Sequence, residues 1–195
     1  MNIQQVSFGK KIPVAKCKVR NNDTHKFIRA KLYEYDCMDE SDILEVKSLP
    51  VGWGFAATIS NEMQTKKAAR EKYDISTNHS FYVLKDEKDS TIGICSIKND
   101  EKYFGVKFIE TLSNGSYKYA GQAILASLAL IALHDKRNKF EVRYPTEEAK
   151  DFYTSKCGFK QGDSLYHLSM DRKGMKKFIK NVQFRTHSPI FDVRS

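Results

Sequence analysis

The sequence predicts an α/β domain whose central sheet is mixed but mostly antiparallel, with helices on both faces. The first reason is the order of the patterns: strand-like runs come first, and a β-α-β-α-β alternation follows from residue 103 onward. The second is the run Ala120–Leu133, which predicts a helix buried on most of its faces. The third is size, because 195 residues with 41% hydrophobic content are enough for one domain with a substantial core.

The first half of the chain predicts strands and two helices. Residues 26–35 alternate apolar and charged side chains, which is the period of a half-exposed strand. Helix-start residues at 39–42 precede a first helix, and a second is predicted over 60–73. Strands over 80–84 and 91–98 follow, joined by a charged hairpin connection. Gly93, inside the second of these strands, indicates a bulge or a close approach of the backbone.

The second half supplies the alternating part of the pattern. It predicts, in order, a strand over 103–112, a polar turn containing Gly115, a helix that ends near Leu133, a strand over 139–144, a helix after Pro145-Thr146, and a strand over 164–170. The helix of residues 120–133 is too short for the ~20 residues that span a bilayer.

Composition suggests boundaries on either side of this domain. Residues 1–24 are basic and weakly patterned, which predicts an N-terminal extension that is either an edge strand or a mobile arm. Residues 25–170 form the predicted domain. Residues 171–195 are a basic C-terminal tail that either contacts RNA or an acidic protein, or packs Phe178, Ile179 and Phe184 on the domain; we favour packing.

The net charge of +9 and the pI of about 9.3 indicate an anionic ligand or partner, without choosing among coenzyme phosphates, nucleic acid and acidic membrane surfaces. Cys17, Cys37, Cys95 and Cys157 have no zinc-type spacing, so we expect free thiols, a reducing compartment and no metal. No signal-peptide pattern opens the sequence, and the expected location is the cytoplasm.

The most informative stretch is the start of the 120–133 helix. It reads Lys118-Tyr119-Ala120-Gly121-Gln122-Ala123, directly after a predicted strand and turn. A helix start made of small residues exposes unpaired backbone N–H groups, and the helix dipole favours an anion there, so this stretch is a candidate phosphate site. The alternative is that Gly121 only lets the helix pack closely on its strand.

A second landmark lies downstream, Ala149-Lys-Asp-Phe152-Tyr153-Thr-Ser-Lys-Cys-Gly158-Phe159. Together the two landmarks resemble the GNAT acetyltransferase superfamily. The first is similar to its Gln/Arg-x-x-Gly-x-Gly/Ala turn, with Lys118 at the Gln/Arg position. The second is similar to its Ala-x-x-Phe-Tyr-x-x-x-Gly-Phe pattern, with one extra residue before Gly158. The resemblance spans about residues 25–170, and its specific motifs lie within 81–170.

This resemblance implies a GNAT-like fold, acetyl-coenzyme A as cofactor, and transfer of the acetyl group to an amine. The pantetheine arm would pair with the backbone near Thr111 and Leu112. The residues implied at the pyrophosphate are Lys118, Tyr119, Ala120, Gly121, Gln122 and Ala123.

Two side chains are candidates for proton transfer. The resemblance implies that Tyr153 faces the coenzyme sulfur and acts as the acid, although a tyrosine in an apolar helix can equally be a core residue. Phe152 is the expected core member of the pair. Glu110 is a lone carboxylate near the end of an apolar strand; burial would suit it to act as the base, and the alternative is an exposed strand face. His79, His134 and His167 form no recognisable metal site or catalytic arrangement.

The functional prediction is an acetyl-coenzyme A-dependent N-acetyltransferase acting on a primary amine of an unidentified small molecule, protein or aminoacyl-tRNA. The alternative is a catalytically inactive GNAT-like module that binds an acyl-coenzyme A or a protein partner. A basic RNA-binding protein of another kind is a third possibility, but no RNP, KH or zinc-knuckle pattern is present. Under each of these three hypotheses, the basic surface is a possible binding site for an acidic or RNA partner.

Overall fold

The computed structural model describes residues 11–50, 52–73, 78–99, 103–112 and 115–193. Its strands are β1 (Ala15–Asn21), β2 (Phe27–Tyr35), β3 (His79–Asp86), β4 (Thr91–Asn99), β5 (Tyr103–Thr111), β6 (Tyr117–Lys118), β7 (Lys139–Arg143), β8 (Lys160–Gln161), β9 (His167–Asp171) and β10 (Phe191–Asp192). Its helices are α1 (Glu40–Lys47), α2 (Ala56–Tyr73), α3 (Ala120–His134), α4 (Glu147–Asp151), the π-helical segment η1 (Phe152–Cys157) and α5 (Arg172–Thr186).

All of these strands belong to one 10-stranded sheet with the order β10-β1-β2-β3-β4-β5-β7-β9-β8, and β6 pairs with β1 outside this path. The β5–β7 pair is parallel and the other pairs are antiparallel. The parallel pair requires a crossover, and α3 supplies it. The predicted mixed, mostly antiparallel sheet is therefore confirmed.

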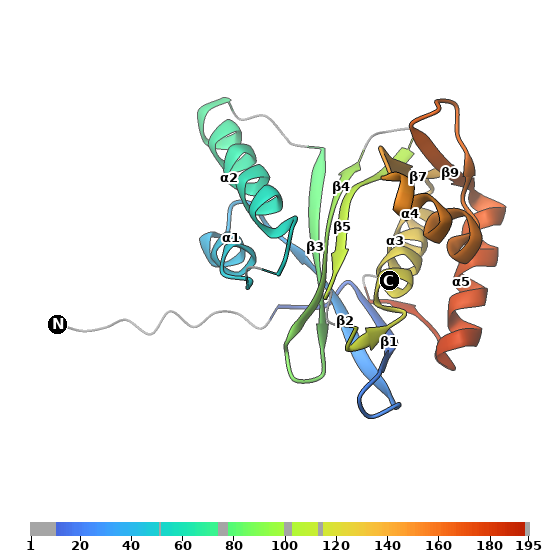
Figure 1. Cartoon of the computed structure of the whole chain (residues 1–195). Coiled ribbons are helices and arrows are strands. Elements are labelled where there is room, and N and C mark those ends of the chain that lie inside the picture. Colours follow the sequence, from blue (N-terminus) through green and yellow to red (C-terminus); the bar gives the residue numbers. More distant parts are fainter. Residues whose placement is uncertain (1–10, 51, 74–77, 100–102, 113–114, 194–195) are drawn as a thin grey trace.

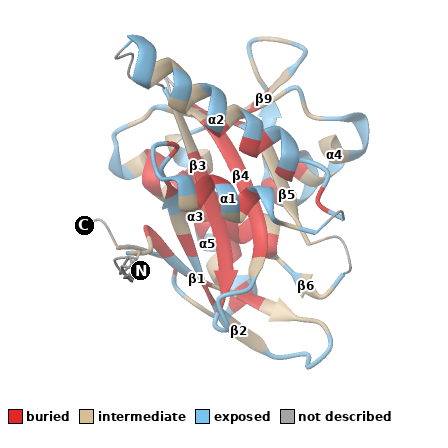
Figure 2. Cartoon of the chain, turned by 90° about the vertical axis from the view of Figure 1, so that its left-hand side faces the viewer, coloured by how far each residue is buried: buried red, intermediate tan, exposed pale blue. Residues whose placement is uncertain are grey.

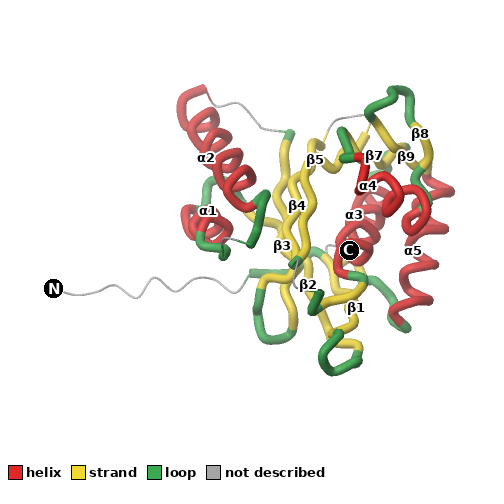
Figure 3. The backbone as a smooth tube through the Cα atoms, in the orientation of Figure 1, coloured by secondary structure: helices red, strands yellow, loops and turns green. Residues whose placement is uncertain are grey.

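Helices cover both faces of the sheet (Figures 1 and 3). α1 and α2 lie on one face over the smaller core, which includes Ile43, Trp53 and Met63. α3, α4 and α5 lie on the other face over the larger core. Figure 2 shows the buried residues of the central strands beneath α1 and α2. Among the described residues, no helix has the length and apolar character needed to cross a membrane.

The N-terminal segment contributes to the larger core. Of the two alternatives that the sequence left open, its described part forms an edge-side strand: β1 pairs with β2 along its length and with β10 and β6 at its ends. Ala15, Cys17 and Val19 point into the core and are buried. Residues 1–10, the rest of the predicted arm, lie outside the described part of the chain.

The C-terminal segment forms α5, whose buried stripe packs on α3 and the sheet. Phe178 and Ile179 are buried, as predicted. The prediction that Phe184 packs on the domain is wrong, because this side chain is 80% exposed. The helix continues to Thr186, and Phe184 falls on the same outward face as Lys180.

Gly93 meets both of the expectations placed on it. The β3–β4 register shifts between Leu84 and Lys85, beside the Leu84–Gly93 pair, which indicates a bulge or irregularity. A Cβ atom added at Gly93 would lie 2.5 Å from Cδ1 of Ile124 in α3. Because real Cβ atoms do not approach so closely, a side chain at Gly93 would force Ile124 to move, so the glycine provides room for this residue of α3.

A bulge in β5 positions the site. Val106 pairs with Ile97 of β4 and Phe108 with Ser96, so Lys107 is an extra residue on the β5 side. Bulges bend a strand and increase its twist. The parallel pairing of β5 with β7 stops at Val106 and Val142. Beyond the bulge, the β5 edge on the β7 side has no strand partner among the described residues.

Candidate active site

The start of α3 presents unpaired backbone donors. The N-cap residue Tyr119 has a left-handed backbone, with φ 72° and ψ 4°, and its side chain makes no capping hydrogen bond. The N–H of Ala123 donates to the carbonyl of Tyr119 at 2.8 Å. The N–H groups of Ala120, Gly121 and Gln122 have no acceptor within the helix, since they precede its first complete turn. An anion at this end would satisfy them and would also interact favourably with the helix dipole.

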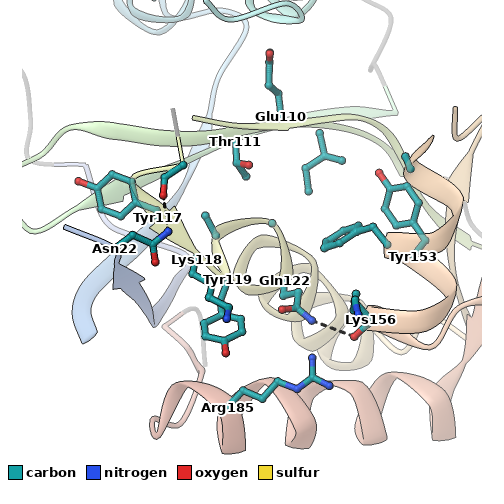
Figure 4. A pocket seen from close by; sticks show the side chains of 16 residues that line it. Asn22, Glu110, Thr111, Tyr117, Lys118, Tyr119, Gln122, Tyr153, Lys156 and Arg185 are labelled. Carbon is teal, nitrogen blue, oxygen red and sulfur yellow. Dashed lines mark hydrogen bonds between the residues drawn. The ribbon is translucent and has the colours of Figure 1, made fainter. Parts of the chain in front are cut away.

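These donors border a pocket of about 800 Å³ that lies between the free edge of β5, the start of α3 and the α4–η1 segment (Figure 4). Its lining residues are Asn22, Ile109, Glu110, Thr111, Gly115, Tyr117, Lys118, Tyr119, Ala120, Gly121, Gln122, Ala149, Phe152, Tyr153, Lys156 and Arg185. The pocket therefore combines backbone donors, three cationic side chains and an apolar wall.

Gly121 allows the start of α3 to lie close to Phe152, and it also borders the pocket. A Cβ atom added there would lie 3.4 Å from Cζ of Phe152 and 3.8 Å from Cγ2 of Thr111. A methyl group would thus be in close contact with Phe152, whereas a longer side chain would have to enter the pocket. Close packing, the alternative that the sequence left open for Gly121, is therefore compatible with a ligand at the same place.

The structure brings most of the predicted site residues together. Thr111, Tyr153 and the run from Lys118 to Gln122 all line the pocket. The side chain of Gln122 is buried and its Nε2 donates to the carbonyl of Lys156 at 3.0 Å, so it ties α3 to η1. Two predicted residues lie outside the lining. Ala123 is fully buried, and Leu112 packs on the smaller core with its N–H donating to Ile92 at 3.2 Å.

Tyr153 occupies the wall opposite β5. It is 6% exposed, packs edge-to-face with Phe152 and Phe159, and still borders the pocket. Burial raises the pKa of its phenol, and the nearby Cys95 and Cys157 thiols raise it further, so the hydroxyl stays protonated at neutral pH. No described residue hydrogen-bonds to this hydroxyl. The hydroxyl is therefore a protonated donor at the pocket wall that is available to hydrogen-bond a ligand.

The π-helical form of η1 explains the extra residue before Gly158. A π-helix closes its hydrogen bond one residue later than an α-helix, so it accommodates a one-residue insertion within a helix. The segment ends at Gly158, which is left-handed with φ 81°. The N–H of Phe159 then donates to the carbonyl of Tyr153 at 3.0 Å. The insertion is absorbed in this way while both Tyr153 and Phe159 stay buried.

Glu110 lies at the edge of the pocket with its side chain pointing away from Tyr153 (Figure 4). Its two carboxylate oxygens accept the N–H groups of Gly54 and Phe55, each at 2.7 Å. These donors immediately precede α2. Glu110 is therefore half-buried on the α2 face and holds the start of α2 against β5.

Removing this carboxylate should weaken the fold. We expect Glu110→Ala to lower the free energy of unfolding by about 1–2 kcal/mol, because two backbone donors lose their acceptor. Glu110→Gln keeps one acceptor oxygen and should cost about half as much. Thermal unfolding of the two variants beside the unmodified protein measures this. Equal stability of all three proteins would show that the two hydrogen bonds contribute nothing.

Several pocket residues were not predicted from the sequence. Asn22 directly follows β1 and Arg185 lies in the last turn of α5, two segments predicted from the sequence to lie outside the domain. Tyr117 donates its hydroxyl to Asp86 at 2.9 Å, and Lys156 lies in η1. The only sequence signal for Arg185 is that residues 172–186 contain no acidic side chain.

Among the described residues, no group of His, Cys, Asp or Glu side chains is arranged to hold a metal ion.

No protein-family model matches the chain, and no curated protein sequence matches it. Solved structures with a similar fold do exist, at low identity. PaiA N-acetyltransferase from Thermoplasma acidophilum, in complex with coenzyme A, matches with a TM-score of 0.50 and 12% identity, over 73% of this chain and 98% of its own. The nucleotide-linked sugar GNAT FdhC matches with a TM-score of 0.53 and 14% identity, over 90% of this chain and 98% of its own.

A spermidine N-acetyltransferase SpeG chimera from Vibrio cholerae and hSSAT has a TM-score of 0.55 and 12% identity, over 75% of this chain and 98% of its own. These structures share with the chain the mixed sheet and its covering helices. The chain therefore has the fold of the GNAT acetyltransferase superfamily.

Proposed function

We propose that the protein is an acetyl-coenzyme A-dependent N-acetyltransferase. The observation that carries this proposal is that the uncapped start of α3 and the hydroxyl of Tyr153 border one pocket. A thioester carrier with a diphosphate needs an anion site and a reaction site at the two ends of an elongated cavity. The fold similarity and the coenzyme A complex of one neighbour support the same class of reaction.

The residues fit this coenzyme. The N–H groups of Ala120, Gly121 and Gln122 would bind the diphosphate, and Lys118, Lys156 and Arg185 would balance its remaining negative charge. The unpaired β5 edge from Lys107 to Thr111 would hydrogen-bond the amide groups of the pantetheine arm. When bound, acetyl-coenzyme A supplies the activated acetyl group.

Acid and base would then act from opposite faces of the sheet. Tyr153, on the α3 face, would donate its proton to the departing thiolate sulfur. Glu110, on the α2 face, is proposed to accept a proton from the attacking amine. Its carboxylate uses two acceptor positions for Gly54 and Phe55 and retains others for this purpose. The amine would approach beside the unpaired edge of β5.

The four cysteines are buried free thiols in the structure, which supports a reducing location such as the cytoplasm.

The acceptor is a primary amine. Spermidine, the amine named for one structural neighbour, and aminoacyl-tRNA are the first candidates to test.

Calorimetric titration with acetyl-coenzyme A, coenzyme A and adenosine diphosphate tests the proposal. We expect all three to bind at one site, with the thioester then consumed in the presence of a suitable amine and free thiol released. Binding of all three without consumption of the thioester, over a wide panel of amines, would indicate the inactive acyl-coenzyme A-binding module instead. Absence of binding would overturn the assignment of the pocket.

A further inference from the structure

The β1–β2 hairpin carries four cationic side chains on one face, here called the basic ladder: Lys16, Lys18, Arg29 and Lys31. Lys16 pairs directly with Lys31 across the two strands, and Lys18 pairs with Arg29. Their Cβ atoms are therefore ~4.5–5.5 Å apart, a distance at which like charges destabilise a sheet. Apolar core residues alternate with them along both strands, so all four point to the same outer face.

The four side chains of the basic ladder form no direct ion pair in the described part of the chain. None of its four side chains lies within ion-pair distance of a described carboxylate, and Lys16, Arg29 and Lys31 are exposed. The next lysine in the same row is different. Lys85 pairs with Lys31 in the sheet and has Glu45 at 2.7 Å and Asp89 at 3.4 Å. Lys31 also borders a pocket lined by Glu45 and Asp89, whereas Lys16, Lys18 and Arg29 lie farther out on the hairpin.

A small apolar groove runs between these cations. It has a volume of about 290 Å³, and its lining combines the whole basic ladder with Cys17, Ala30, Ser188, Pro189 and Phe191. Phe191 pairs with Lys16 in the sheet and is 57% exposed. An exposed aromatic ring beside cations offers a surface for stacking and positive charge for an anion, and one kind of ligand uses both.

We propose that the basic ladder and Phe191 bind single-stranded nucleic acid. The cations would contact phosphates, and a base would stack on Phe191 within the groove. Alternate residues of one strand are ~6.8 Å apart, which matches the rise of two nucleotides in a stacked strand. A groove of this size admits one unpaired base, whereas a duplex keeps its bases inside the helix. This inference concerns a second surface and does not depend on the transferase assignment.

Fluorescence anisotropy with a short labelled single-stranded RNA, and with the DNA of the same sequence, tests the proposal. The ladder variant is Lys16→Gln, Lys18→Gln, Arg29→Gln and Lys31→Gln combined. The control variant is Lys173→Gln, Lys176→Gln, Lys177→Gln and Lys180→Gln combined on α5, which removes the same charge from another exposed basic face. Thermal unfolding verifies that both variants are folded.

The ladder variant should bind the single strand at least about tenfold more weakly. The magnitude of the slope of log affinity against log salt concentration should fall by about 2–3, because each lost phosphate contact reduces it by ~0.7. The control variant should keep the slope. Phe191→Ala should lower affinity about fivefold with the slope unchanged, as expected for stacking. Equal losses in both charge variants, tighter binding to the duplex or to anionic vesicles than to the single strand, or no binding at low salt would each overturn the proposal.

Discussion

Gly121→Asp is expected to abolish coenzyme binding while leaving the protein folded. The new carboxylate would stand in the first turn of α3, beside the N–H groups assigned to the diphosphate. Two unit charges ~4 Å apart repel by about 4 kcal/mol at an effective dielectric constant of 20, so we expect affinity for coenzyme A to fall at least ~100-fold. The same carboxylate interacts favourably with the helix dipole, by ~0.3–1 kcal/mol, so stability should be retained.

Gly121→Asn is the matched control, because asparagine has the same size without the charge. Both side chains must fit beside Phe152, whose Cζ would be 3.4 Å from the new Cβ. Calorimetry should show a far larger loss for aspartate than for asparagine. Similar losses in the two variants would mean that bulk alone blocks the pocket and that no diphosphate lies at the start of α3.

Tyr153→Phe should lower kcat by about 100-fold or more and leave affinity for coenzyme A nearly unchanged, the usual effect of removing a general acid. The replacement keeps the ring that packs between Phe152 and Phe159. Because no described residue hydrogen-bonds to the hydroxyl, its loss should not destabilise the fold. Steady-state rates combined with calorimetry separate the two effects, and unchanged turnover would remove Tyr153 from the acid role.

Tyr117→Phe is the control within the same pocket, since the Tyr117 hydroxyl already donates a hydrogen bond to Asp86 and its loss should not affect turnover.

The pH dependence of turnover gives a further check on Tyr153. Burial raises the pKa of Tyr153 above the ordinary value near 10, so its protonated form persists as pH rises through that value. Ionisation of this residue should therefore not limit turnover of the unmodified protein below pH ~10.

The sequence by itself determined the class of fold, the strand–turn–helix segment and the second helix with its Phe152-Tyr153 pair. These features are local: the apolar periodicity of residues 104–112 and 120–133, and the small residues at the start of α3, fix them without distant contacts. The extra residue before Gly158 was also visible in the sequence. Its accommodation as a π-helix was not, because that depends on keeping Tyr153 and Phe159 packed together.

Tertiary structure alone decided which side chains of β5 face the pocket. Simple alternation from Phe104 and Val106, both in the larger core, would place Glu110 on the α3 face. The bulge at Lys107 reverses this, so that Thr111 faces the pocket and Glu110 turns to α2. Asn22 and Arg185 reach the pocket because β1 pairs with β2 in the sheet and α5 packs on α3. Pairing between distant strands sets both outcomes, and local pattern carries no information about it.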